Sequence, residues 1–367
     1  MRSLAVWTTT AAVALLGVAA HAQTNSAAPV ATAAPAAAPA QSGDLQTAIA
    51  GYARYQTDVT DLRAASIASN DALETALDRV GRHNKDELTR GFIAYGSQVA
   101  AQSPAFVQGV RDAAAFYGRD AVIWAVSVDP SYARGLRGGQ EATRMLLDTV
   151  EGDAARVVSV ADRYQEMAYS LQRQRWASAV APGQAARLQR VRGLGAPGAG
   201  PALPDGVAPH LTAATLSITP GADPSALGGR QFWDTVHGGA HAQVVAVSAS
   251  APTAWRVNIT RGMALDRMAA VAALQALDAT TSNQTAISAL LSDPRSRDCF
   301  EMAQLQLYQC MSAAHFRYEN AFCLGQHGLR DVGVCMSAVG QPDTTAMTPL
   351  PAAAPATTSS TTRSSRP

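Results

Sequence analysis

All four cysteines of this chain lie between residues 299 and 335, and their spacing constrains the C-terminal third more than any other feature. In an antiparallel helical hairpin, residues that face each other have numbers that add up to a constant. The numbers of Cys299 and Cys335 add to 634, and those of Cys310 and Cys323 add to 633. Cys299 and Cys310 are eleven residues apart, which brings them back to nearly the same helix face. The spacing favours a helical hairpin with two nested disulfides, Cys299–Cys335 and Cys310–Cys323.

Two observations keep the other two pairings open. No turn residue stands near Phe316-Arg317, where the hairpin has to reverse. Cys323 and Cys335 are twelve residues apart and are therefore less well aligned on a helix. The motif Cys-x-x-Cys of a catalytic thiol pair is absent, so we expect structural bridges. Three glycines allow the second arm to deviate from a regular helix, or alternatively to form a closed loop: Gly325, Gly328 and Gly333.

The first 22 residues have the pattern of an export signal. Arg2 gives a positive start, residues 11–20 form an apolar run without a charge, and Ala-His-Ala at 20–22 is a small-x-small cleavage pattern before Gln23. The run is too short for a membrane-spanning helix, and neither a twin arginine nor a lipid-accepting cysteine is present. We expect a Sec-exported bacterial protein of the periplasm or the medium, with no transmembrane segment after signal removal. Disulfides form and persist in such compartments.

Composition divides the chain into a folded body between two polar ends. Both ends are rich in Ala, Pro, Thr and Ser, which favours extended or disordered conformations. The predicted segments are a signal peptide (1–22), an Ala/Pro-rich disordered tether (23–43), a helical domain (44–192), a Gly/Pro-rich linker (193–230), a small α+β domain with the cysteines (231–340) and a disordered tail (341–367).

The segment 44–192 has helical periodicity throughout. Alanine makes up roughly a fifth of the chain, and because it has the best helix propensity we expect a mainly α fold. Asn70 is a candidate helix cap, Asn84 begins a capping box, and Ser103 precedes a proline at a typical helix start that Gly118 would end. After Asp153 a coiled-coil-like seam indicates a long helix packed in a bundle or, alternatively, one that binds a partner helix; its members are Val157, Val160, Tyr164, Met167 and Leu171.

The pattern changes after residue 192. The letters Gly-Leu-Gly-Ala-Pro-Gly at 193–198 match the dinucleotide fingerprint, but no strand precedes them and no helix follows, so we expect no nucleotide site there. Alternation at 255–260 predicts a half-buried strand. Further strands at 215–219 and 244–247, and helices at about 263–277 and 285–291, complete a smaller α+β part.

Charge and motif content exclude several functions. The net charge of +1 provides no field to attract nucleic acid. Lys85 is the one lysine, and its neighbours match neither a phosphate-binding Gly-Lys-Ser/Thr loop nor a Ser-x-x-Lys motif. We interpret the polar run 82–87 around it as a solvated helix junction. No Gly-x-Ser-x-Gly elbow or readable acid–base pair is present, so no catalytic or cofactor-binding residue is predicted.

His237 and His241 form the one histidine pair with metal-ligand spacing. Gly238 and Gly239 between them argue against a helix, so we favour a glycine-rich loop with incidental histidines over a metal site. Tryptophans offer a second set of candidates, because their faces could stack on a glycan, although such side chains are more often core anchors. These are Trp124, Trp176, Trp233 and Trp255.

None of these motifs identifies a family. We expect an exported, non-enzymatic cell-envelope protein with an interaction or structural role, whose partner is another envelope protein or peptidoglycan. The alternatives are an envelope enzyme acting on peptidoglycan or another glycan, and a periplasmic metal-binding protein.

Overall fold

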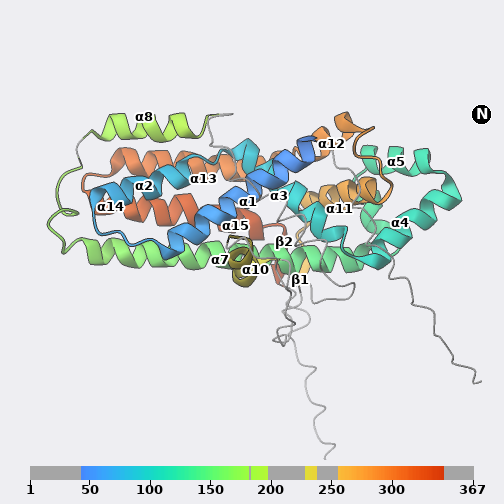
Figure 1. Ribbon diagram of the computed structural model, residues 1–367, viewed down its shortest axis with the longest axis horizontal. Coiled ribbons are helices and arrows are strands. Elements are labelled where there is room, and N and C mark those ends of the chain that lie inside the picture. Colours follow the sequence, from blue (N-terminus) through green and yellow to red (C-terminus); the bar gives the residue numbers. More distant parts are fainter. Residues whose placement is uncertain (1–42, 182, 197–227, 238–254, 343–367) are drawn as a thin grey trace, which may run out of the picture. The chain divides into compact units, whose positions relative to one another are not determined.

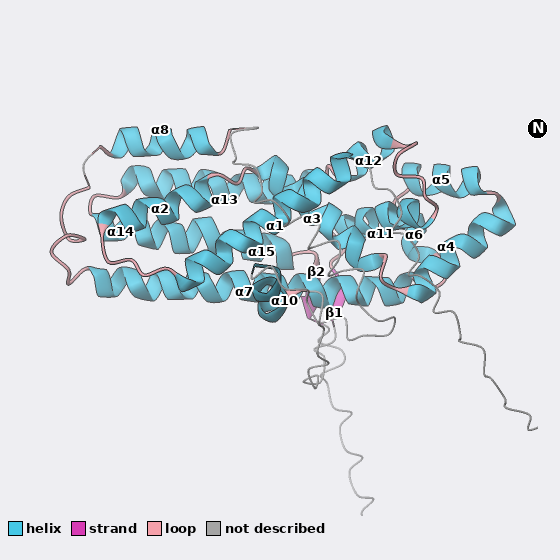
Figure 2. Cartoon of the chain, viewed as in Figure 1, coloured by secondary structure: helices cyan, strands magenta, loops and turns pink. Residues whose placement is uncertain are grey.

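The computed structural model describes residues 43–181, 183–196, 228–237 and 255–342, and these form a mainly helical fold (Figures 1 and 2). The signal peptide, the tether up to residue 42, most of the linker, the tail beyond residue 342, and the strands expected at 215–219 and 244–247 lie outside the described residues. Residue 43 belongs to a helix and residues 341–342 to a strand, so the disordered ends predicted at 23–43 and 341–367 are each too long on the side of the folded body. The helices are α1 (Gly43–Ala64), α2 (Asn70–Gly81), α3 (Lys85–Ala100), α4 (Pro104–Tyr117), α5 (Arg119–Val128), α6 (Ser131–Gly135), α7 (Gly139–Leu171), α8 (Gln184–Leu194), α10 (Gly229–His237), α11 (Met263–Ala276), α12 (Gln284–Leu290), α13 (Pro294–Ala313), α14 (Arg317–Cys323), the π-helix η2 (Leu324–Arg330) and α15 (Asp331–Ser337).

Helix starts follow the capping residues closely. The Asn84 side chain accepts from the Glu87 backbone N–H at 2.9 Å, and Ser103 Oγ accepts from Phe106 N–H at 3.2 Å, as the sequence predicts. The cap of α2 is one residue earlier than predicted. Ser69 Oγ accepts from Ala72 N–H at 3.2 Å, while Asn70 is already the first helical residue. Serine and asparagine are equally good caps, so two adjacent candidates leave the boundary ambiguous.

The long helix α7 extends well beyond the predicted seam, beginning at Gly139 rather than after Asp153. The seam itself is buried at four of its five positions, with Met167 half-buried. Helix α7 packs against α14, η2 and α15 of the same chain, in addition to α3 and α10. The seam therefore serves packing within the bundle, as the favoured interpretation predicts.

Helices from the segments 44–192 and 231–340 share one hydrophobic core. The alanine-rich helix α11 is almost entirely buried and packs along α3, while η2 and α15 pack along α7. Alanine side chains permit this close approach because little volume separates the two backbones. The core residues of both segments are therefore continuous.

Strand structure in the described residues is limited to one short antiparallel pair, seen in Figure 2. Strand β1 (Trp255–Val257) pairs with β2 (Gly340–Pro342), with Arg256 opposite Gln341. The predicted strand at 255–260 is confirmed only over its first half. Ile259 lies beyond it and is exposed, because the chain turns at Asn258, whose side chain accepts from the Thr260 backbone N–H at 2.9 Å.

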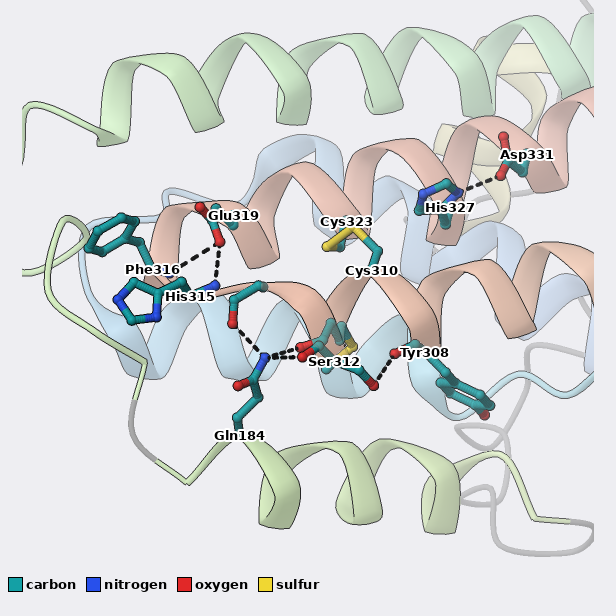
Figure 3. The surroundings of a disulfide bond; sticks show 12 residues. Gln184, Tyr308, Cys310, Ser312, His315, Phe316, Glu319, Cys323, His327 and Asp331 are labelled. Atoms are coloured by element: carbon teal, nitrogen blue, oxygen red, sulfur yellow. Dashed lines mark hydrogen bonds and ion pairs between the residues drawn. A yellow bond between two sulfur atoms is a disulfide. The ribbon is translucent and has the colours of Figure 1, made fainter.

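The four cysteines form the two nested disulfides that the spacing favours. Cys299 is bonded to Cys335 and Cys310 to Cys323, with Cα atoms 5.7 and 5.6 Å apart. One arm of the hairpin is α13, and the other is the continuous run α14–η2–α15 (Figure 3 shows the inner bridge). The π-helix explains how the twelve-residue interval between Cys323 and Cys335 matches the eleven-residue interval between Cys299 and Cys310 on the other arm. Hydrogen bonding from i to i+5 takes up an extra residue per turn and restores the register.

The turn of the hairpin contains no glycine or proline because a carboxylate organises it instead. The Glu319 side chain accepts from the backbone N–H groups of His315 and Phe316, the latter at 3.2 Å (Figure 3). On the other side, the Gln184 side-chain amide faces the last carbonyls of α13, including that of Met311 at 2.7 Å. Side chains thus satisfy the backbone carbonyls at the end of α13 and the backbone N–H groups before α14, and one of these side chains is distant in sequence.

Candidate interaction surface

The helical pair α4–α5 exposes more large apolar side chains than a packed helix pair requires. Phe116 is 80% exposed, Tyr117 64%, Trp124 67% and Val128 64%. Phe116 and Tyr117 stand at the corner of the pair, with ring centroids 4.7 Å apart in an edge-on arrangement. Trp124 and Val128 are four residues apart on α5 and therefore share one helix face. We call these four residues the α4–α5 surface.

Local sequence explains the corner. Gly118 has a φ of +95°, a conformation that favours glycine, and it both ends α4 and precedes α5. The inner faces of the two helices are buried by apolar residues that include Phe106, Val110, Val122 and Val126. Helix α5 is therefore apolar on two faces, only one of which is covered. This double apolar face is the signal that sequence analysis missed, since it treated Trp124 only as a possible stacking platform.

The corner is held against the C-terminal end of α11. Arg119 donates to the Leu277 carbonyl from Nε at 3.2 Å and from Nη2 at 2.9 Å, and Arg111 Nε donates to the Ala276 carbonyl at 3.3 Å. Both arginines thus occupy the carbonyl end of a helix, where cations are favourable. The exposed side chains are carried on an anchored element, which lowers the entropy lost when a partner binds.

Charges around the corner are balanced. Arg119 lies 3.8 Å from Asp120, whose side chain is almost fully exposed, and Arg137 is paired with Asp112 at 2.6 Å. These exposed pairs contribute little to stability. An apolar, aromatic centre with a polar rim is the composition of protein–protein interfaces.

A second apolar surface lies beside the inner disulfide. A groove of about 280 Å³ is formed by α7, α13 and α14. Its lining includes Tyr169, Tyr318, Phe322 and the cysteines of the bridge Cys310–Cys323. Tyr169 is 66% exposed and Phe322 is 37% exposed, so this groove has fewer strongly exposed large apolar side chains than the α4–α5 surface.

The predicted histidine pair is only partly described. His237 is the last residue of α10, not part of a loop as predicted, and its Nε2 lies 2.8 Å from Asp61 Oδ1. The helix forms because its burial against α1 and α7 outweighs the glycines that follow it. His241 lies outside the described residues. Within the described ranges, no group of three or more His, Cys, Asp or Glu side chains is arranged to hold a metal ion.

The four tryptophan candidates divide by burial. Trp233 is 1% exposed and belongs to the core, while Trp176 and Trp255 are half-buried and pack against it. Trp124 alone among the four presents most of its surface to solvent. A stacking role for a glycan is therefore confined to Trp124.

A buried polar network at Asp153 was not predicted. The Asp153 carboxylate accepts from Tyr52 Oη at 2.8 Å, Gly229 N–H at 2.7 Å and Trp233 Nε1 at 2.6 Å, which attaches α10 to α1 and α7. Burial raises its pKa to about 6, although these donors and Arg156 act in the opposite direction. Asp153, Tyr52 and Trp233 are buried, and Gly229 is partly buried, so the network ties α10 to the core. The sequence feature that could have indicated this network is an acidic residue, Asp153, directly before the apolar seam of the same helix.

The interpretation of residues 82–87 as solvated is wrong at His83. The His83 side chain is 1% exposed, packs edge-on against Tyr55 with centroids 5.3 Å apart, and has Nε2 2.8 Å from Asp58 Oδ2. Lys85 remains near the surface, where it is paired with Glu301. A short polar junction is buried here because α13 and η2 cover it, a contact that local sequence does not encode.

No described helix combines the length and apolar character that crossing a membrane requires. Comparison with known proteins finds no matching family model, no matching curated protein and no matching solved structure.

Proposed function

We propose that this chain is an exported, non-enzymatic protein of the bacterial cell envelope, and that it binds another protein through the α4–α5 surface. The observation that carries the proposal is the exposure of Phe116, Tyr117 and Trp124 on one anchored helical corner. Aromatic side chains dominate interface energetics because each buries a large area at low entropic cost. Exposed apolar clusters of this kind mark interaction sites on otherwise polar surfaces.

The two disulfides and the export pattern support the envelope location in this proposal. Two disulfides close the C-terminal hairpin, and no described cysteine is free. Such bridges persist in oxidising compartments, in line with the export pattern of residues 1–22. The Asp153 carboxylate is buried and accepts hydrogen bonds from α1 and α10, which supports a structural role for that network.

Site-specific photocrosslinking tests the proposal. A benzoylphenylalanine at Ala121, which is exposed on α5, should crosslink one defined envelope protein in living cells. The same probe at Asp298 on α13 is the matched control and should not capture that protein. The variants Phe116→Ala and Trp124→Ala should each reduce the crosslink at least tenfold while the melting temperature changes little, because neither side chain is buried.

Two outcomes would replace the proposal. Equal crosslinking from Ala121 and Asp298, or crosslinking that survives both substitutions, would show that the corner is not the binding surface. Sedimentation of the purified protein with peptidoglycan, lost in Trp124→Ala, would instead support the glycan hypothesis, for which the exposed indole is the supporting observation.

A further inference from the structure

A small cavity lies where α1, α2, α3, α13 and η2 meet, away from the α4–α5 surface. Its volume is about 20 Å³, and its lining is mostly apolar, with Phe300, Leu307 and Val332 among the residues. Tyr55 and His83 also line it. Both are buried, at 1% and 5% exposure. The cavity therefore combines an apolar wall with two polar side chains.

One of these polar groups has a ring nitrogen without a partner. His83 Nε2 lies 2.8 Å from Asp58 Oδ2, and Arg79 and Arg82 lie 3.4 and 3.7 Å from the same carboxyl group. The imidazole therefore uses Nε2 toward Asp58, which leaves Nδ1 for another hydrogen-bond partner. This atom is buried and has no hydrogen-bond partner among the described residues.

The other polar group is a phenol that retains its proton. Burial raises the pKa of Tyr55 well above its ordinary value. Its hydroxyl is also buried without a hydrogen-bond partner in the described part of the chain. The Tyr55 ring stands edge-on to His83, with centroids 5.3 Å apart, so both polar groups belong to the same small space.

We infer that a single water molecule binds in this cavity and bridges His83 Nδ1 and the Tyr55 hydroxyl. Buried polar groups are nearly always hydrogen-bonded, to protein or to an ordered water. A cavity of about 20 Å³ has room for one water, and two polar partners meet the minimum that a buried water needs. The water completes a chain from Asp58 through His83 to Tyr55, which joins α1 to the junction before α3.

A crystal structure of the oxidised chain at about 1.5 Å resolution tests the assignment. We expect one density peak between 2.6 and 3.2 Å from both His83 Nδ1 and Tyr55 Oη. A direct hydrogen bond between the two side chains, with no peak between them, would overturn the inference. A peak at 2.0–2.2 Å from the imidazole would also overturn it, because that distance belongs to a metal ion.

Oxygen-17 relaxation dispersion tests the same water in solution. Val332→Leu adds a methylene to the cavity wall and should remove one long-lived water from the count, whereas Val334→Leu, on the exposed face of the same helix, should leave it unchanged. Tyr55→Phe should shorten the residence time of that water at least severalfold. An unchanged count in Val332→Leu, with the substituted side chain seen to fill the cavity, would contradict the proposal.

Discussion

At the residue scale, Asp278 occupies a position suited to glycine. It is the one non-glycine residue with positive φ in the described ranges, at +51°. The Ala279 N–H returns to the Leu274 carbonyl at 2.9 Å and the Asp278 N–H to Gln275 at 3.0 Å, the two bonds of a Schellman cap after α11. This cap fixes the carbonyls that Arg111 and Arg119 contact, so it contributes to positioning the α4–α5 surface.

Asp278→Gly should raise the free energy of unfolding by roughly 0.5–1 kcal/mol, because glycine relieves the left-handed strain. Chemical denaturation at neutral pH measures the change. Asp298→Gly in α13 is the matched control, and it should lower the free energy by roughly 0.3–0.5 kcal/mol because that position is helical and exposed. Equal effects of the two substitutions would show that the backbone of Asp278 is not strained.

The buried Asp153 gives a pH dependence with an unusual sign. Its pKa in the folded chain, about 6, lies above the 3.8 of the free side chain because of burial. The native state therefore binds the proton more tightly, and stability from this group is present below about pH 4 and lost as the pH rises towards 6. Asp153→Asn removes the titration and preserves an acceptor for Gly229 and Trp233.

The stability of Asp153→Asn relative to the natural chain should thus increase between pH 4 and 7, by up to roughly 3 kcal/mol. Urea unfolding at several pH values measures the difference. A difference that is constant with pH would mean that the carboxyl group ionises in the folded chain as it does in water, and one that decreases as pH rises would mean that folding lowers its pKa.

At the element scale, the nested pairing could be predicted and the geometry around it could not. The sum rule depends only on two regular helical arms, and α13 supplies one of them. The π-helix and the turn depend on tertiary contacts. Glu319 lies three residues after Phe316 and could have been recognised as a capping residue, whereas Gln184 comes from a different helix that local sequence does not contain. The absence of a glycine or proline therefore argued misleadingly against the correct pairing.

Gly325 tests the packing of the π-helix on α7. A Cβ atom at this position would lie 2.9 Å from the Ala161 carbonyl oxygen and 3.0 Å from Tyr164 Cβ. Gly325→Ala should therefore lower the free energy of unfolding by about 1–3 kcal/mol through overpacking. Gly193→Ala is the control, because it lies in α8 with open space around it and should raise stability by up to about 1 kcal/mol. Stabilisation by both substitutions would place η2 farther from α7.

At the scale of the whole molecule, sequence periodicity predicts which faces are buried but not what covers them. The apolar faces of α1, α3 and α7 could be identified from the spacing of their apolar residues, and the mainly α class followed from them. The helices that cover these faces could not be identified from the sequence. Helix α11 packs on α3 across an interval of many residues, and His83 is buried beneath elements from the far end of the chain. The α4–α5 surface is the reverse case, since apolar spacing there predicts burial and the structure leaves one face exposed.

The shared core predicts one cooperative unfolding transition for residues 43–342. Calorimetry should give equal calorimetric and van't Hoff enthalpies, although the sequence divides this region into two expected domains.

Replacing Cys299 and Cys335 by alanine opens a loop of sequence separation 36 and should lower stability by roughly 3–4 kcal/mol. Because α7 links the hairpin to α1 and α3, amide exchange should accelerate in those helices as well as in α13 and α15. Faster exchange confined to residues 294–337, or two resolved calorimetric transitions, would show that the hairpin folds as a separate unit beside the bundle.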